Sequence, residues 1–335
     1  MSHSVVTTPS TFVSSGRYAE DRPPASIAVR TWAPDGIGPD NPPVAILQLH
    51  HGMVEHISRY DRFARAAAAE GLLVVGMDFI GHGDSAEDPD DLGHTGVRLS
   101  GGRNPLVEDV HTLRQHTQEQ WPGVPYVIFG HSMGSFVVRS YLARHGRGLD
   151  GAIICGTGTL DPVMGGVAGI LLALIGVGRA PRHRSSLFAA ASLGAYNKPF
   201  EKHGARTGFD WLSRDPEQVD AYVDDPRCGG IFTLAADRVL MDVIGQANSP
   251  ATYRDTPHSL PLLLLSGGAD PVGAMGTGAA AVAERYRRAG ATDVTLRLYP
   301  QARHELLNEL NRDEVTQDIF GWLRRIGIPS IPDNA

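Results

Sequence analysis

The stretch FGHSMGSF, residues 129–136, decides the fold. It follows an apolar, β-prone run that begins at Pro125, and it leads into a segment whose apolar residues recur at helical spacing. Ser132 is therefore expected where a buried strand turns sharply into a helix. Gly130 and Gly134 flank it and lack the Cβ atoms that would collide in so tight a turn. The pattern is the G-x-S-x-G nucleophile elbow, which exposes the serine hydroxyl at the end of the strand.

On both sides of the elbow, strand-like and helix-like segments alternate along the chain. The expected strands are 26–32, 44–50, 72–78, 125–129, 149–155, 260–266 and 293–299, and the expected helices are 60–70, 104–120, 135–144, 279–289 and 312–325. The central strands are continuous apolar runs, which is typical of parallel strands buried on both faces. We therefore predict an α/β fold, with a mostly parallel central sheet and helices on both of its faces.

One long segment interrupts this alternation. It begins after the apolar run that ends at Cys155, and it contains no regular succession of strand and helix. We interpret residues 157–256 as a mainly helical cap inserted into the sheet domain. Residues 1–156 and 257–335 then form the core of that domain.

Composition excludes several classes of partner. The 335 residues include 37 acidic and 30 basic side chains, for a net charge of −7, without a long basic run, which argues against a nucleic-acid partner. The two cysteines, Cys155 and Cys228, indicate neither a disulfide framework nor a thiolate metal site. The first residues lack the pattern of a signal peptide, and no stretch is long and apolar enough to span a bilayer. We therefore expect a cytoplasmic protein, of an oligomeric state that the sequence leaves open.

A serine nucleophile needs a base to take its proton and a carboxylate to orient that base. Asp270 follows the expected strand 260–266, and His304 follows the expected strand 293–299. The carboxyl ends of parallel strands meet at one edge of the sheet, and in hydrolases of this kind the chain order is Ser, Asp, His. We therefore predict a catalytic triad of Ser132, Asp270 and His304.

An oxyanion hole needs two backbone N–H donors. Met133 follows the serine at the start of its helix and supplies one. The loop after the strand 44–50 should supply the other, and there Gly52 lets the backbone turn inward so that the N–H of Met53 becomes the expected donor.

Three histidines in the same loop, His50, His51 and His56, raise the question of a metal. Neighbouring side chains of an extended segment point to opposite faces, so His50 and His51 make a poor chelating pair. We therefore expect no metal site.

Five sequence blocks resemble a known group of proteins. They are HHGMVEHISRY (50–60), MDFIGHGDS (77–85), GHSMGS (130–135), SGGADPV (266–272) and ARHELLNE (302–309). Together they resemble the monoacylglycerol lipase and lysophospholipase branch of the α/β-hydrolases, which is itself similar to the family named serine aminopeptidases. The resemblance spans roughly residues 44 to 325. It implies an α/β-hydrolase fold, triad roles for Ser132, Asp270 and His304, and oxyanion roles for Met53 and Met133.

Two details accompany the resemblance. Ser135 stands where many members have a third glycine, and its small side chain is expected to have little effect. The block around Gly81 and Gly83 is expected to be structural, with Asp78 and His82 bracing the loop beside the site through hydrogen bonds.

The segment from Val163 to Gly178 is uncharged, rich in glycine and too short to span a membrane. Two interpretations stay open. Its apolar side lines an acyl-binding pocket, or it forms a mobile lid that docks transiently on membranes or micelles while Arg179, Arg182 and Arg184 meet anionic headgroups.

The leading hypothesis is a serine hydrolase that cleaves carboxylic esters of monoacyl lipids through an acyl-enzyme and needs no cofactor. An aminopeptidase or amidase is an alternative that requires a carboxylate for the α-amino group of the substrate. Candidate acids in the cap are Glu201, Asp210, Asp215, Asp220, Asp224 and Asp225. An acyltransferase is a further alternative if water is poorly admitted. A non-catalytic binding protein is disfavoured because all three triad candidates are present.

Overall fold

A computed structural model describes residues 4–96, 103–159, 162–191, 193–202 and 204–329. Its centre is one eight-stranded sheet in the order β1-β2-β4-β3-β5-β6-β7-β8. The strands are β1 (Val5–Val13), β2 (Ser26–Pro34), β3 (Ala45–His50), β4 (Leu72–Met77), β5 (Tyr126–His131), β6 (Gly151–Cys155), β7 (Leu262–Gly267) and β8 (Val294–Tyr299). Strands β3 to β8 pair in parallel, which confirms the predicted mostly parallel sheet.

Strands β1 and β2 form the antiparallel side of the sheet. The sequence analysis predicted β2 but missed β1, which is polar and mostly exposed. An outermost strand faces solvent and needs no apolar run. Pro9 is tolerated there, because a strand at the edge has no further neighbour that requires its missing N–H.

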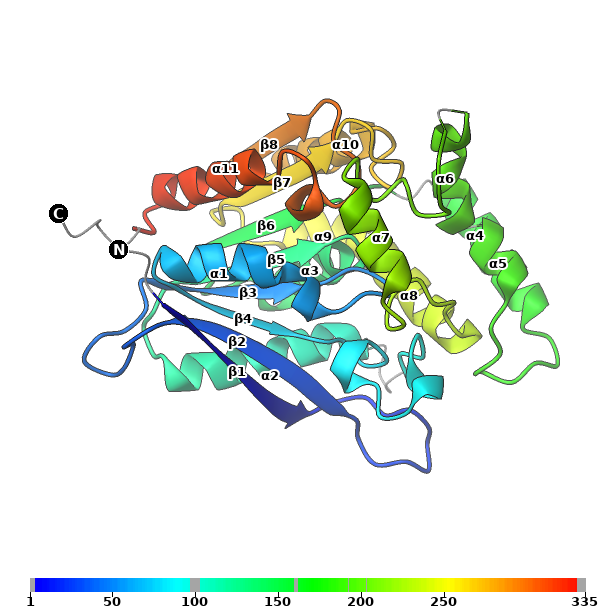
Figure 1. The fold of residues 1–335 in the computed structure, drawn as a ribbon, viewed down its shortest axis with the longest axis horizontal. Coiled ribbons are helices and arrows are strands. Elements are labelled where there is room, and N and C mark those ends of the chain that lie inside the picture. Colours follow the sequence, from blue (N-terminus) through cyan, green and yellow to red (C-terminus); the bar gives the residue numbers. More distant parts are fainter. Residues whose placement is uncertain (1–3, 97–102, 160–161, 192, 203, 330–335) are drawn as a thin grey trace.

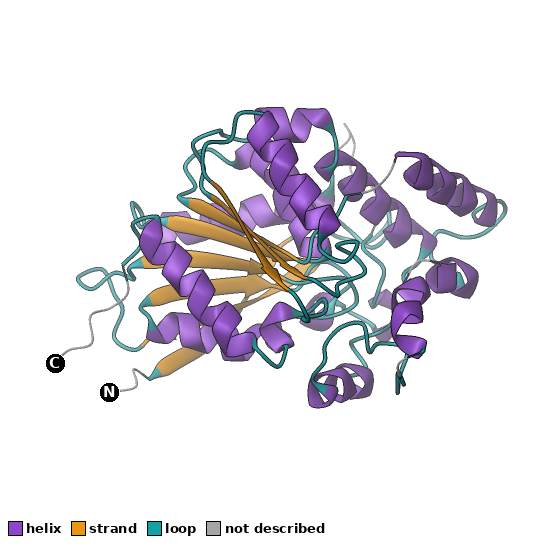
Figure 2. Ribbon diagram, turned by 90° about the horizontal axis from the view of Figure 1, so that it is seen from above, coloured by secondary structure: helices purple, strands orange, loops and turns teal. Residues whose placement is uncertain are grey.

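Helices cover both faces of the sheet, as predicted (Figure 2). One face packs against α1 (Asp61–Ala69) and α11 (Arg312–Arg325). The other packs against α2 (Pro105–Gln120), α3 (Met133–His145) and α10 (Thr277–Arg288). Short 3-10 helices lie in the connecting loops: η1 (Ile57–Tyr60), η2 (Gly83–Ser85), η3 (Pro89–Asp91) and η5 (Leu306–Asn308).

Between β6 and β7 the described chain is helical. The helices are α4 (Pro162–Ile175), α5 (Ser186–Ala191), α6 (Leu193–Glu201), α7 (Pro216–Asp224), α8 (Leu234–Ala247) and α9 (Pro250–Asp255). Figure 1 shows α4 to α7 beyond one end of the sheet. The end of α8 is tied to α3, because Arg139 donates to the Ala247 carbonyl at 2.8 Å and Ser140 donates to that of Val243 at 3.2 Å. We retain 157–256 as the proposed bounds of the cap.

A helix must be both long and apolar to cross a bilayer. Within the described ranges, no helix is both long and apolar enough to cross a bilayer.

Candidate active site

Ser132 stands at the turn between β5 and α3, in a backbone conformation that side chains rarely adopt. Its φ is 52° and its ψ is −118°. A Cβ at Gly130 would lie 2.3 Å from the Gly134 carbonyl oxygen, and one at Gly134 would lie 2.4 Å from that of His50. The turn therefore requires both glycines and holds the serine under strain. Ser135 fits the third position because its hydroxyl donates to the Ser132 carbonyl at 2.6 Å.

His304 and Asp270 meet beyond the ends of β8 and β7. The His304 Nδ1 and the Asp270 Oδ1 are 3.0 Å apart, and both side chains are buried. The backbone N–H of Val272 donates to the same carboxylate oxygen at 2.9 Å, which fixes the carboxylate. When the imidazole carries its proton on Nδ1, the second ring nitrogen can accept one.

The second nitrogen of His304, Nε2, is buried and has no hydrogen-bond partner in the described structure. Ser132 and His304 both line one cavity of about 480 Å³. The His304 ring is held between the rings of His131 and Trp211, at centroid distances of 4.8 and 5.0 Å. The geometry therefore places an oriented imidazole and a strained serine in the wall of one cavity, which agrees with the predicted base and nucleophile.

The loop after β3 lies against the serine. Gly52 and Met53 line the same cavity as Ser132 and Met133. A Cβ at Gly52 would lie 3.1 Å from the Ser132 Cβ, so glycine permits the close approach. In the described part of the chain, neither the Met53 nor the Met133 backbone N–H donates to a protein group. Both are thus free to face an oxyanion.

A buried polar network surrounds this loop. Glu55 accepts hydrogen bonds from the Gly52 N–H at 2.5 Å and from the Tyr60 hydroxyl at 2.9 Å. Arg59 lies 2.6 Å from Glu55 and binds both carboxylate oxygens of Glu305, at 2.6 and 2.7 Å. The network therefore joins the oxyanion loop to the segment that carries His304.

The buried network shifts the pKa values of Glu55 and His131. Burial opposes the ionisation of Glu55, but His131 and Arg59 hold the pKa of its carboxyl well below the ordinary value. Burial by itself would lower the pKa of His131, yet the hydrogen bond and the charge of Glu55 raise it. The end of the cavity next to Ser132 is therefore polar and internally neutralised. Sequence reasoning missed this network, because Glu55 lies in a loop and its partners His131 and Glu305 are distant in sequence.

The loop around Gly81 and Gly83 was predicted to be braced by hydrogen bonds of Asp78 and His82, and the structure shows where each side chain bonds. Asp78 accepts from the Ile57 N–H at 2.7 Å and from the Asp84 N–H at 2.8 Å, so its carboxylate joins two loops. His82 instead lies 3.1 Å from the carbonyl of Ile80 in its own loop. Burial lowers the pKa of His82 to about 3, so the ring is neutral. Asp78 therefore links two loops through hydrogen bonds, whereas His82 bonds within its own turn and packs its ring against those of His51 and Phe232.

One trio in the described structure has side chains of metal-ligand type close together. Donor atoms of His56, Asp225 and Cys228 lie within 4.8 Å of one another. However, the Asp225 carboxylate already receives His56 at 2.9 Å and Arg227 at 3.1 Å. Burial also raises the pKa of the Cys228 thiol to about 12. A protonated thiol and a committed carboxylate suit a link between cap and core better than a metal site.

The cavity has a second, apolar end in the cap. Val167, Ala168 and Leu171 of α4 line it from one side, and Met241 and Ile244 of α8 line it from another. This is the pocket-lining role expected of the uncharged segment, for which side chains are described from Gly165 onward. The same helix also exposes apolar side chains, with Ile170 at 64% and Leu174 at 65%.

The structure gives contacts for two of the three arginines suggested to meet lipid headgroups, and it places the cap acids suggested to bind an α-amino group. Arg182 pairs with Asp91 at 2.7 Å, and Arg184 donates to the Leu92 carbonyl at 2.6 Å, so both tie the cap to the core. The cap acids considered for an α-amino group do not line the cavity; these are Glu201, Asp210, Asp215, Asp220, Asp224 and Asp225. Among the described residues, the acid that lines the cap end is Asp237, which sequence reasoning missed.

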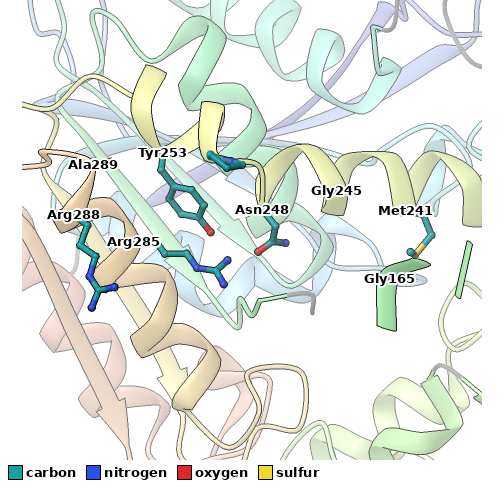
Figure 3. A pocket seen from close by; sticks show the side chains of 9 residues that line it. Gly165, Met241, Gly245, Asn248, Tyr253, Arg285, Arg288 and Ala289 are labelled. Atoms are coloured by element: carbon teal, nitrogen blue, oxygen red, sulfur yellow. The ribbon is translucent and has the colours of Figure 1, made fainter. Parts of the chain in front are cut away.

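A second, more open cavity of about 750 Å³ lies beside α8, α9 and α10 and shares Met241 with the first. Figure 3 shows Met241 at one side of it and Arg285 and Arg288 at the other. Neither Ser132 nor His304 lines it. Although larger, it contains no predicted nucleophile and is therefore not the candidate active site.

The fold and the serine elbow define an α/β-hydrolase. Residues 41–311 match the family described as Serine aminopeptidase, S33, and the chain belongs to that family. A monoacylglycerol lipase of Mycolicibacterium smegmatis is 29% identical over 289 residues, which cover 85% of this chain and 90% of that protein. A monoglyceride lipase of Mus musculus is 28% identical over 306 residues, which cover 88% and 85%. A solved carboxyl esterase from Bacillus coagulans, in complex with glycerol, is 30% identical with a TM-score of 0.84, covering 96% of this chain and 98% of that one.

Proposed function

We propose that this carboxylic ester hydrolase cleaves esters of monoacyl lipids, with monoacylglycerols as its substrate class. One observation carries the proposal. A cavity of about 480 Å³ joins a polar end, beside a strained serine and a carboxylate-oriented histidine, to an apolar end in the cap. Its volume is within the usual range for small-molecule sites. A monoacyl lipid likewise has a polar part and an apolar part, since a polar alcohol and an apolar acyl chain are joined at the ester.

In the proposed reaction, Ser132 attacks the ester carbonyl while His304 Nε2 takes the serine proton. Asp270 holds the imidazole in the required tautomer and stabilises the imidazolium. The N–H groups of Met53 and Met133 receive the oxyanion, and each such donor is typically worth about 3–4 kcal/mol of barrier. His304 then protonates the leaving alcohol, and a water activated by the same histidine releases the acid.

The polar end explains how a small alcohol could be held. Glu55, His131 and Glu305 line the cavity beside Ser132. Their oxygens and nitrogens are already fixed by one another, so they present oriented partners to hydroxyl groups without a large entropy cost. Among the described residues that line the apolar end, Asp237 is the one charged side chain that could meet a headgroup.

The test compares three substrates in one assay: a long-chain monoacylglycerol, a lysophosphatidylcholine with the same chain, and an aminoacyl anilide. The Ser132→Ala variant serves as the control and should lose about 10⁴-fold or more in kcat. A preference for the monoacylglycerol supports the proposal. A preference for the lysolipid, or turnover of the anilide alone, would contradict it, and transfer of the acyl group to an added alcohol in place of water would identify an acyltransferase.

We also propose that the exposed face of α4 contacts the lipid surface from which substrate is drawn. Ile170, Leu174 and Val177 are largely exposed, and they lie on the cap segment whose other side lines the cavity. Exposed apolar side chains at the mouth of a lipid site are typical of interfacial contact. Sedimentation with phosphatidylcholine vesicles tests this, and the Ile170→Gln, Leu174→Gln double variant should remain in the supernatant. Equal sedimentation of variant and wild type would contradict the contact.

A further inference from the structure

One acidic side chain in the cap end of the cavity has no evident purpose in the structure. Asp237 lies on the face of α8 that also presents Leu240, Met241 and Ile244 to the cavity. Asp237 is only 7% exposed to solvent. Within the described ranges its carboxylate makes neither a hydrogen bond nor an ion pair, in contrast to Glu55 at the other end.

The side chains that flank Asp237 on α8 belong to an apolar cluster. Leu234 and Met241, one turn before and one turn after it on α8, pack with Leu172 of α4 and Phe188 of α5. The neighbouring Arg238 is directed away, because its guanidinium lies against Gly176 at the end of α4. No charged group contributes to the ionisation of Asp237, and burial alone raises the pKa of its carboxyl to about 7.

An unpartnered acid in such a place is costly to the folded protein. Burying a polar group without a hydrogen-bond partner is unfavourable, and burying a lone charge more so. A position that needed only to line an apolar pocket would be served better by leucine, as at Leu240. The carboxyl is therefore placed where a ligand could supply its missing partner.

Under the proposed function, the part of the substrate that reaches this apolar end of the cavity is the acyl chain. A hydroxyl group on that chain suits the carboxyl in both of its protonation states, since a hydroxyl donates to a carboxylate and accepts from a carboxylic acid. An amine would require a buried ion pair within an apolar wall, which costs the desolvation of two charges. The surroundings therefore favour a neutral hydroxyl.

We propose that Asp237 is a specificity-determining residue that binds a hydroxyl group carried on the acyl chain, so that esters of hydroxy fatty acids are preferred substrates. The inference rests on the proposed ester hydrolysis and names the acyl group that this site selects. It requires no change in the chemistry at Ser132, because Asp237 touches the chain and not the ester.

The test uses glyceryl esters of one chain length, unsubstituted or with a hydroxyl near the carbonyl, at mid-chain or at the end. For at least one positional isomer, the wild type should show a kcat/KM about tenfold or more above that of the unsubstituted ester. Asp237→Leu should abolish this ratio and raise kcat/KM for the unsubstituted ester, while Asp237→Asn should keep part of the ratio. Asp224→Asn, which changes an exposed cap acid outside the cavity, is the matched control and should behave as the wild type.

A second readout is independent of turnover. Calorimetric binding of the free hydroxy fatty acid to Ser132→Ala should be about tenfold tighter than that of the unsubstituted acid, and Asp237→Leu in the same background should remove the difference. Equal kcat/KM for all isomers, a ratio that survives Asp237→Leu, or a preference for an amino-substituted chain would each overturn the inference. In those cases turnover of the unsubstituted ester shows that the proposed function stands. If no ester were turned over at all, the proposed function would fall as well.

Discussion

The two ends of the cavity are built on opposite principles. Beside Ser132, each buried charge has a partner: Arg59 lies between Glu55 and Glu305, and His131 lies against Glu55. In the cap, apolar side chains surround one acid, Asp237, that has no partner in the described structure. A fully paired network is rigid and fixes the geometry of reacting groups. An unpaired polar group in an apolar wall instead lowers the stability of the protein, and it favours ligands that supply the missing hydrogen bond.

The largest effect is expected where the core end orients the base. Asp270→Asn should leave the fold intact and lower kcat for a monoacylglycerol by about 10⁴-fold, because the amide would favour the wrong tautomer of His304. Steady-state kinetics with a matched thermal melt would measure this. A variant that kept more than about a tenth of the activity would contradict the orienting role.

A stability effect is expected from breaking the paired network. Arg59→Met should lower the free energy of unfolding by about 3–5 kcal/mol, because Glu305 would lose its buried cationic partner and Glu55 would keep only His131. Urea titration measures the change. Arg62→Met is the control, since Arg62 pairs with the exposed Asp313 and should cost at most about 1 kcal/mol. Equal losses in the two variants would show that the network is not specially coupled.

Replacing the unpaired acid at the cap end should raise the free energy of unfolding, in contrast to Arg59→Met, and the gain should depend on pH. The carboxyl pKa of Asp237 rises from its ordinary 3.8 to about 7 on folding. The folded state therefore holds the proton more tightly, and between these values its stability falls as pH rises. Asp237→Leu removes that loss, so its gain in unfolding free energy should be larger at about pH 8 than at about pH 5. The difference should reach a few kcal/mol, since each pKa unit corresponds to roughly 1.4 kcal/mol.

Asp224→Leu is the control for this measurement, because Asp224 is exposed and its substitution should give no comparable pH dependence. Urea titrations of both variants at the two pH values supply the data. A pH-independent effect of Asp237→Leu would mean that the carboxyl is hydrated or paired in solution.

The smallest effect is expected on the exposed face of α4. Ile170→Gln should change the free energy of unfolding by no more than about 0.5 kcal/mol, because the side chain is 64% exposed. Thermal melts measure this change. A large destabilisation would show that the face packs against protein, for example a second copy of the chain, and not against lipid.

Features that depend on local sequence pattern could be predicted from the sequence alone. The elbow, the alternating elements and the order of Ser132, Asp270 and His304 follow from local pattern, because each residue lies just past its own strand. The α/β-hydrolase fold is confirmed. The triad and the oxyanion pair stay predictions that the geometry supports.

What the sequence did not predict depends on contacts between distant segments. Arg59 and Glu305 are 246 residues apart, and no local pattern pairs them. Asp237 follows the start of its helix, where an acid is commonly a favourable neighbour of the helix dipole in solvent. Only the packing of α4 and α5 over it turns an ordinary helix-start acid into a buried one. The edge strand β1 was missed because its polar sequence has no apolar run to mark it.

The central claim is that Ser132 forms the acyl-enzyme within this cavity. The most direct test mixes the enzyme with a monoacylglycerol, quenches it in acid within milliseconds to seconds, and locates the added mass by peptide mass spectrometry. We expect one acyl group on Ser132, absent from the Ser132→Ala variant and strongly reduced in His304→Ala. An acyl group on another residue, or undiminished ester turnover by Ser132→Ala, would contradict it.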